Sequence, residues 1–544
     1  MRNSRYTLRR ILKFVYRIFP LPTGLKLRMK EKALSKFGMI SSLSVSRPIR
    51  HTDEQREIAL AHFCSPRRKA VLLREFEEPG TAPGEIAVHI HLYYIDMAED
   101  FLNYLSHIPY SFDLFVSITD ADNQQYVARL FPKCPNVRRL KVVVVFNRGR
   151  DVAPMITAFP ELPTYGYFLH IHTKKSPHLE HTFNWREHLL KNLTGSREHI
   201  MRVFRLFESY PDIGIVYPEP NPELPYWTLT TLSNESEMRR LFELIGIEFP
   251  DKEKYVDFPV GTMFWARGTA LQKLFTPRIS LEVFQEECGQ LDGTLSHAVE
   301  RSLCLIISDA GYLPAQLDID KGFVHIGPGA RNLAEYLATE AAEMERYLRS
   351  FKHIVFDVFG TLVCSDYEKY DQLADDAFWE SGRKRAVEPE FEIFAESCRP
   401  RSVVADIFMR LQDDGYDVVI AEDTVWTLPQ MEKILEMCKI TGFRDIYLSG
   451  SIGMRKRDGS MYSFLAENRF KNRAFVHVGN HELDDMQTPN DLGISTFHVM
   501  HPHDMMTIGS FDEKYYDRCR DDPFCLRELF GECAERTDVT EFRA

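Results

Sequence analysis

Two histidines and two lysines stand where an apolar, strand-like run ends, at His170, His172, Lys174 and Lys175. Because side chains alternate along a strand, both histidines should point to the same face. They would then either bind a divalent metal such as Mg²⁺ or Mn²⁺ together or hydrogen-bond a phosphate. The two lysines would supply permanent positive charge for a departing anion.

A glycine-containing turn precedes this strand, at Asn147-Arg148-Gly149-Arg150-Asp151. Gly149 would let the backbone approach a ligand closely. An H-x-H pair is also common in packed strands, and the chain has a second one at His89 and His91. The combination of turn, histidines and lysines favours an anion site, with Arg150 and the lysines stabilising the anion without a metal.

The elements expected to position these residues alternate between strand and helix. The predicted strands are 86–94, 112–119, 140–146, 167–172 and 213–217, with helical periodicity at 100–106, 122–130 and 197–210. This order predicts an α/β domain with a mostly parallel sheet covered by helices. The Pro- and Gly-rich segment before residue 85 marks its beginning.

The order of these elements resembles the nucleotide-binding half of a GT-A glycosyltransferase. The strings NRGRDVAP, HIHTKKS, GTMFWARG and GQLDGTLSHAVER together resemble the rhamnan synthesis protein F family over about residues 1–320. The resemblance implies sugar transfer from a nucleotide sugar during assembly of a rhamnose-containing polysaccharide. Its implied acceptor is a lipid-linked glycan.

Such an enzyme must hold a nucleoside diphosphate, neutralise it as it leaves and deprotonate an acceptor hydroxyl. On the GT-A pattern Asp292 is the candidate base, while its alternative role is to cap the following helix, 297–309. His297 and Glu300 share one side of that helix and would orient the acceptor. Donor binding is assigned to Asn147, Arg150, Asp151, His170, His172, Lys174, Lys175, Trp185 and Arg267. Trp185 would stack on a sugar ring, although a large aromatic is as often in a core.

A second α/β unit follows, with predicted strands at 353–356, 417–421, 445–449, 474–478 and 496–499. The string FDVFGTL at 356–362 resembles the first motif of the haloacid dehalogenase superfamily, whose fold is Rossmann-like. The resemblance carries over to Asp357, Thr361, Lys456 and Asp485.

Three positions depart from what a phosphatase of this superfamily needs. Phe359 replaces the acid that protonates the leaving group, Glu422 replaces a serine or threonine, and Asn480 replaces an acidic residue. A carboxylate at Glu422 would also repel phosphate. We therefore expect this domain to be structural or regulatory rather than an active phosphatase.

Charge is distributed unevenly along the 544 residues. Residues 1–50 carry a net charge of +12 and the rest −24. Apolar residues interleave with the basic ones near Phe14, as in a helix lying on an anionic membrane surface, although a helix docked on the protein body fits the same pattern. We expect no nucleic-acid partner and no bilayer-spanning segment. Ten cysteines without a C-x-x-C pair indicate reduced thiols, so the chain is expected in the cytoplasm on the membrane face.

The predicted organisation has six parts: a basic arm (1–50), a connecting segment (51–84), the GT-A-like domain (85–330), a helical linker (331–350), the haloacid dehalogenase-like domain (351–502) and an acidic tail (503–544). The sequence favours a bacterial glycosyltransferase. Two alternatives stay open: a hydrolase carrying a carbohydrate-binding module, and an inactive scaffold in a polysaccharide-assembly complex.

Overall fold

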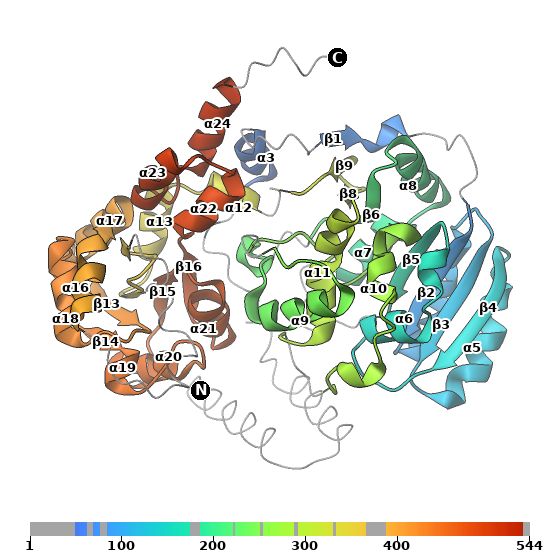
Figure 1. Ribbon diagram of the computed structural model, residues 1–544, viewed down its shortest axis with the longest axis horizontal. Helices are drawn as coiled ribbons and strands as arrows, with labels where there is room; N and C mark the ends of the chain where they lie inside the picture. The colour runs from blue at the N-terminus through green and yellow to red at the C-terminus, as the bar shows by residue number, and fades with distance from the viewer. Residues whose placement is uncertain are drawn as a thin grey trace.

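The computed structural model shows two α/β lobes side by side (Figure 1). The structure describes residues 49, 51–61, 69–76, 84–173, 185–220, 224–250, 254–287, 292–329, 333–365 and 388–536. The basic arm, Lys174 and Lys175 lie outside the described residues. Among the described helices, none combines the length and the apolar character that a bilayer span requires.

The front lobe is built on a nine-stranded sheet of order β1-β9-β8-β6-β7-β5-β2-β3-β4. Its strands are β1 Lys69–Leu72, β2 Ile86–Leu92, β3 Phe112–Ile118, β4 Val137–Val144, β5 Tyr167–His172, β6 Ile213–Pro218, β7 Phe264–Arg267, β8 Leu313–Asp318 and β9 Phe323–Ile326. Strands β5, β2, β3 and β4 run parallel, whereas β7 is antiparallel to both of its neighbours. The parallel half therefore presents all its carboxyl ends at one edge, where ligands of such sheets bind.

Helices cover both faces of this sheet. They are α4 Ala98–Ser106, α5 Gln124–Leu130, α6 Val152–Ala158, α7 Trp185–Thr194, α8 Arg197–Ser209, α9 Glu235–Ile245, α10 Gln272–Phe275 and α11 Leu295–Asp309. Helices α4, α5, α7 and α8 pack on one face and α6, α9, α10 and α11 on the other, giving two hydrophobic cores. Strand alternation sends Ala87, and with it His89 and His91, to the face covered by α6 and α11.

The rear lobe has a five-stranded parallel sheet of order β14-β13-β10-β15-β16. Its strands are β10 His353–Phe356, β13 Asp417–Glu422, β14 Ile446–Leu448, β15 Phe475–Gly479 and β16 Ser495–His498, with a small ribbon of β11 Val363–Cys364 and β12 Arg399–Pro400. Its helices are α13 Ala341–Leu348, α16 Glu388–Ser397, α17 Ser402–Asp413, α18 Leu428–Met437, α19 Ser449–Ile452, α20 Ser460–Phe464 and α21 Thr488–Asp491. The first strand in the chain is central, so the connections run outward in both directions from β10. A crevice forms beyond the carboxyl end of such a strand.

Regions expected to be connectors are part of the folded body. The segment 51–84 contributes β1 and helix α3 Asp53–Ala61, and the predicted helical linker is two helices, α12 Ala334–Ala338 and α13. The predicted tail forms α22 Pro502–Gly509, α23 Tyr516–Asp521 and α24 Leu526–Arg536. Apolar residues of α3, α12, α22 and α24 share one core. Thus the linker and the tail pack together (Figure 1).

The two lobes meet through buried polar contacts. Lys254 Nζ of the front lobe lies 2.7 Å from Glu482 Oε2 and 3.0 Å from Asp504 Oδ2 of the rear lobe. The neighbouring Tyr255 hydroxyl donates to Glu482 Oε1 at 2.9 Å. Because Glu482 is only 1% exposed, its charge depends on these partners.

Candidate functional site

Four histidines form two adjacent rows in the front sheet. The parallel register of β2 and β5 sets His89 beside His170 and His91 beside His172. All four side chains are buried, and the rings of His89 and His170 stack with their centroids 4.9 Å apart. The predicted same-face orientation of His170 and His172 is confirmed, and both approach Asp151.

A single chain of hydrogen bonds runs through this cluster, and elementary valence fixes its direction. The Asp151 carboxylate only accepts, so His170 Nε2 donates to it at 3.2 Å. Neutral His170 then accepts at Nδ1, where His89 Nδ1 donates at 2.8 Å. His89 Nε2 must accept the Ser117 hydroxyl at 3.1 Å, so Ser117 Oγ accepts from His91 Nδ1 at 2.9 Å. Every proton in this chain therefore points towards Asp151.

The charge state of the cluster follows from its burial. Desolvation lowers the pKa of His89, His91 and His170, that of His91 to about 3, so these rings are neutral near pH 7. Burial alone would raise the pKa of Asp151. The adjacent His172 and the hydrogen bond from His170 outweigh it and hold the pKa below its usual range. Asp151 is thus a fixed anion.

The histidines connect to helix α11 through one glycine. His172 Nε2 donates to the Gly261 carbonyl at 2.8 Å, and the Gly261 N–H donates to Glu300 Oε1 at 2.6 Å. Gly261 has a φ of 93°, a conformation that favours glycine. Glu300 therefore positions the turn before β7 against the histidine cluster, instead of projecting freely as an acceptor-binding carboxylate.

Asp292 is anchored by two residues of the turn that precedes helix α9. Asn234 Nδ2 donates to its Oδ1 at 2.8 Å, and the Ser233 hydroxyl donates to its Oδ2 at 3.0 Å. Burial raises the pKa of Asp292, but Arg301 and Asn234 lower it more, leaving the pKa below its usual range. Helix α11 is preceded by Thr294 and has no side-chain cap, so the capping alternative for Asp292 is wrong.

His297 and Arg150 bring the two halves of the site together. His297 is 6% exposed; its Nδ1 lies 2.8 Å from Thr294 Oγ1, and its Nε2 has no hydrogen-bond partner among the described residues. Burial and then the positive charge of Arg150 lower the pKa of His297 to about 4, while Asp292 and Asp151 act in the opposite direction. The neutral imidazole of His297 is therefore influenced by charges of the turn after β4 (Arg150 and Asp151) and by Asp292, just before α11.

Two predicted donor residues are part of the framework. The Arg267 guanidinium donates to the Ile213 carbonyl at 2.8 Å and the Tyr167 hydroxyl at 2.9 Å, at the amino end of β5 and away from His172. This position argues against the predicted role of Arg267 in donor binding. Trp185 is 4% exposed in the core beneath α7, which argues against stacking on a sugar. Asn147 is exposed at the end of β4, and Arg150 is 39% exposed with Glu287 3.8 Å away.

The residues do not fit the predicted metal alternative. Both ring nitrogens of His170 are engaged with protein partners, and His172 Nε2 binds a carbonyl oxygen. Among the described His, Cys, Asp and Glu side chains, no group of three has an arrangement that would hold a metal ion.

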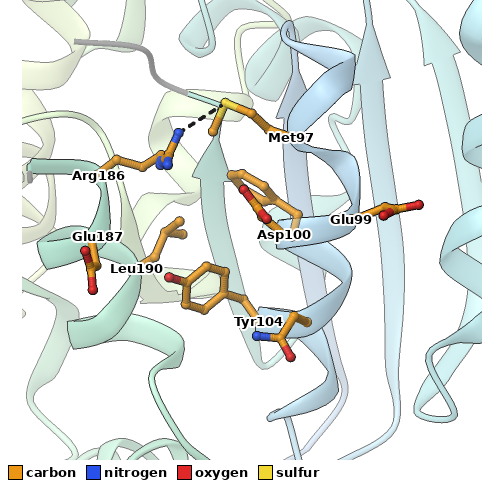
Figure 2. A pocket seen from close by; sticks show the side chains of 9 residues that line it. Met97, Glu99, Asp100, Tyr104, Arg186, Glu187 and Leu190 are labelled. Carbon is orange, nitrogen blue, oxygen red and sulfur yellow. Dashed lines mark hydrogen bonds between the residues drawn. The ribbon is translucent and has the colours of Figure 1, made fainter. Parts of the chain in front are cut away.

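A surface cavity of about 420 Å³ lies between α4 and α7, on the face of the sheet opposite the histidines (Figure 2). Arg186 reaches across it to Met97, while Glu99, Asp100 and Glu187 make its rim acidic. This acidic rim repels a nucleoside diphosphate. None of the predicted site residues lines the cavity.

The rear site assembles every residue carried over by motif. Lys456 Nζ donates to Asp357 and, at 2.8 Å, to Asp485 Oδ1, and the Thr361 hydroxyl donates to Asp357 Oδ2 at 3.0 Å. Asp485 also accepts the N–H groups of residues 480 and 481. His477 Nε2 donates to Asp485 as well, at 3.0 Å. Burial would raise the pKa of Asp485, but Lys456 and His477 lower it below its usual range.

The side chains at the three substituted positions of the rear site all contact other residues of the rear lobe. The Phe359 ring is 6% exposed and lies 5.3 Å from the Phe394 ring, so this residue belongs to the core. Glu422 Oε2 accepts the N–H of Val358 at 2.8 Å and of Phe359 at 3.1 Å. Asn480 contacts the Thr361 hydroxyl.

Sequence reasoning missed several residues of the front site. Ser117, which links two histidines, and Ser233 and Asn234, which hold Asp292, have no motif of their own. The His89/His91 pair had a usable signal, because two H-x-H pairs on neighbouring parallel strands can lie side by side, as they do here. The alternative reading of an H-x-H pair as packed describes His89 and His91 correctly.

The comparisons with known proteins concern mainly the front lobe. Residues 46–312 match the family described as Rhamnan synthesis protein F, which agrees with the resemblance seen in the motifs. Over 229 residues the chain is 30% identical to WxcX, an uncharacterized protein of Xanthomonas campestris pv. campestris, in strains B100 and ATCC 33913. The match covers 41% of this chain and 32% of WxcX, so the chain spans about a third of the length of these curated relatives.

Solved structures add little. The glycosyltransferase GlyE of Streptococcus pneumoniae TIGR4 is 8% identical, with 81% of this chain and 99% of GlyE covered and a TM-score of 0.19. A protein assigned as a beta-phosphoglucomutase from Thermotoga maritima is 13% identical, with 33% and 98% covered and a TM-score of 0.22. Scores this low carry no argument about fold or function.

Proposed function

We propose that the front lobe is a GT-A-like glycosyltransferase that moves a sugar, with rhamnose as the first candidate, from a nucleotide sugar to a growing cell-surface polysaccharide such as rhamnan, O-antigen or capsule. The family match over residues 46–312 supports this class of function. The observation that carries the proposal is the Asp292 carboxylate, which Ser233 and Asn234 hold just before helix α11. The buried ring of His297 stands in the first turn of that helix, and the positive charge of Arg150 acts on it.

The proposed step uses these groups in named roles. As the acceptor oxygen bonds to the sugar carbon, its proton passes to Asp292, and the bond from that carbon to the diphosphate breaks. Asp292 is ionised at neutral pH and its side chain is 23% exposed, so it can accept the proton. Arg150 stabilises the leaving diphosphate, together with Lys174 and Lys175. His297 Nε2 binds a substrate hydroxyl.

Asp151 completes the proposed donor site. Its carboxylate is held by His170 and is only 10% exposed, so it offers its remaining lone pairs in one fixed direction. A fixed carboxylate next to Arg150 suits recognition of a sugar hydroxyl, because a mobile one would lose more entropy on binding.

A panel of nucleotide sugars tests the donor class. The cognate donor should raise the melting temperature of the full chain in proportion to the logarithm of its concentration, because it binds only the folded state. The variant Arg150→Gln should weaken this response, whereas Arg129→Gln, on the outer surface of α5, should not. If no nucleotide sugar changes the melting temperature, the proposed donor class is wrong.

We propose further that the rear lobe is not a phosphatase and that residues 1–50 bind an anionic membrane surface, where a lipid-linked acceptor would be presented. Phe359 offers no acid to protonate a leaving group, which supports the first proposal. Hydrolysis of aryl phosphates with Mg²⁺ that is lost in Asp357→Asn would favour the alternative of a working hydrolase. Binding to vesicles with anionic but not neutral lipid, lost on removing residues 1–50, tests the second.

A further inference from the structure

Two successive backbone N–H groups converge on one point at the centre of the rear site. Those of Val358 and Phe359, which follow β10 and Asp357, both point at the same oxygen, at 2.8 and 3.1 Å. Convergent backbone amides of this kind form a concavity that binds anions. Lys456, 4% exposed and bonded to the adjacent Asp357, adds positive charge to the same crevice.

The atom at this point belongs to the protein itself. It is Oε2 of Glu422, the last residue of β13, and the side chain is 5% exposed. Burial, and then the adjacent Asp357, raise the pKa of Glu422 well above its usual range. This shift favours the neutral form of the carboxyl, which forms a hydrogen bond with Asp357 in addition to the two amide bonds.

Asn480 closes the same crevice from β15. With its amide nitrogen turned towards the surrounding oxygens, it donates to Asp357 Oδ2 at 3.0 Å and to the Phe359 carbonyl at 2.8 Å. Gly360 permits this approach, because a Cβ there would lie 2.5 Å from the Asn480 side chain. The protein's own side chains thus satisfy both the N–H donors of the crevice, through Glu422, and its oxygen acceptors, through Asn480.

We propose that Glu422 is a built-in occupant of an oxyanion site, so that the rear lobe is complete without a bound phosphate and opens to one when Glu422 is shortened. This proposal is independent of sugar transfer in the front lobe. The glutamate at position 422 then has a physical role, because it keeps the Val358 and Phe359 amides and Lys456 ordered when no ligand is bound. The loop that follows β15 can then serve as a fixed support for Lys254.

The test compares two double variants that differ only at position 422. In both, Asp357→Asn removes the carboxylate that would repel an anion. Glu422→Ser opens the site, whereas Glu422→Gln keeps an oxygen facing the two amides. Inorganic phosphate should raise the melting temperature of the Ser variant with increasing concentration and leave the Gln variant and the unaltered chain unchanged. A crystal of the Ser variant grown with phosphate should show the anion on the Val358 and Phe359 amides.

Three results would overturn the proposal. They are stabilisation of the unaltered chain by phosphate, an equal response of the two double variants, and a folded Ser variant that phosphate does not stabilise. If the Ser variant does not fold, the thermal stability of the single variant Glu422→Gln still tests the proposal. A protonated Glu422 is replaced by an isosteric amide that can make the same contacts, so this variant should unfold at no lower a temperature than the parent at pH 8. A clear loss of stability there would show that Glu422 is ionised and is not the proposed neutral occupant.

Discussion

His89 and His170 face each other on adjacent strands, with Nδ1 2.8 Å from Nδ1. Two like atoms at this distance require one donor and one acceptor, so the proton on one ring determines the proton on the other. The consequence extends through Ser117 to His91 at one end and to Asp151 at the other. The cluster is therefore a single polar unit rather than four separate histidines.

Removing Ser117 should break this unit. Ser117→Ala leaves His89 Nε2 and His91 Nδ1 buried without their partner, at an expected cost of about 2–3 kcal/mol in the free energy of unfolding. Ser302 in α11 is equally buried, but its hydroxyl has no hydrogen-bond partner among the described residues. Ser302→Ala should therefore cost no more than about 0.5 kcal/mol. Equal effects of the two variants in denaturant unfolding would refute the hydrogen-bond chain.

Acidification should destabilise the front lobe through its neutral histidines. The pKa of His91 falls from about 6.5 in an unfolded chain to about 3 in the structure, so the unfolded state binds more protons between these values. The stability due to the neutral ring is present above pH 6.5 and declines as the pH falls towards 3. Between pH 7.5 and 5.0 this residue alone should cost about 2 kcal/mol. In His91→Gln, the loss of unfolding free energy between pH 7.5 and 5.0 should be smaller by about 2 kcal/mol. Parallel profiles of stability against pH for the two proteins would show that His91 does not have this lowered pKa.

The turn after β4 should depend strongly on its glycine. Gly149 has a φ of 68°, and a Cβ there would meet Ala153 and the Phe284 ring, the latter at 2.9 Å. Gly149→Ala should cost about 3 kcal/mol, combining left-handed strain with overpacking. Gly246 has a similar φ of 71° but nothing within 4 Å, so Gly246→Ala should cost only about 1 kcal/mol. The difference between the denaturation midpoints of Gly149→Ala and Gly246→Ala measures how much packing at Gly149 contributes to stability. A difference near zero would exclude close packing at Gly149.

The elements and the site residues differ in how far sequence predicts them. All ten predicted strands occur, because long apolar runs between turn residues have few other solutions in an α/β chain. Strands β1 and β9, which pair with each other, are short and gain their stability from that pairing, so local pattern misses them. Arg267 and Trp185 lie within the framework, and their residue types could not predict this, because residue type says nothing about which end of a strand or which side of a helix faces a ligand. The partners of Asp292 come from residues about 58 positions away and have no local signal.

The contact between the lobes should also be measurable. Lys254→Met would leave Glu482, 1% exposed, and Asp504 without their shared cation, at an expected cost of about 3 kcal/mol. Lys273→Met removes a lysine that is 47% exposed and paired with Asp309 on the surface, and it should change stability by less than about 1 kcal/mol. Thermal unfolding of both variants tests this contrast. A Lys254→Met protein as stable as Lys273→Met would show that the lobes do not rely on this contact.

Sugar transfer with Asp292 as the proposed base is tested most directly by the transfer rate of Asp292→Asn with the cognate nucleotide sugar. The amide keeps the shape and the contact with Ser233 but cannot take a proton, so kcat should fall by about 100-fold or more while donor binding is retained. Asp309→Asn, at the far end of α11, is the matched control and should transfer at the parent rate. An Asp292→Asn protein that transfers sugar as fast as the control would show that Asp292 is not the base.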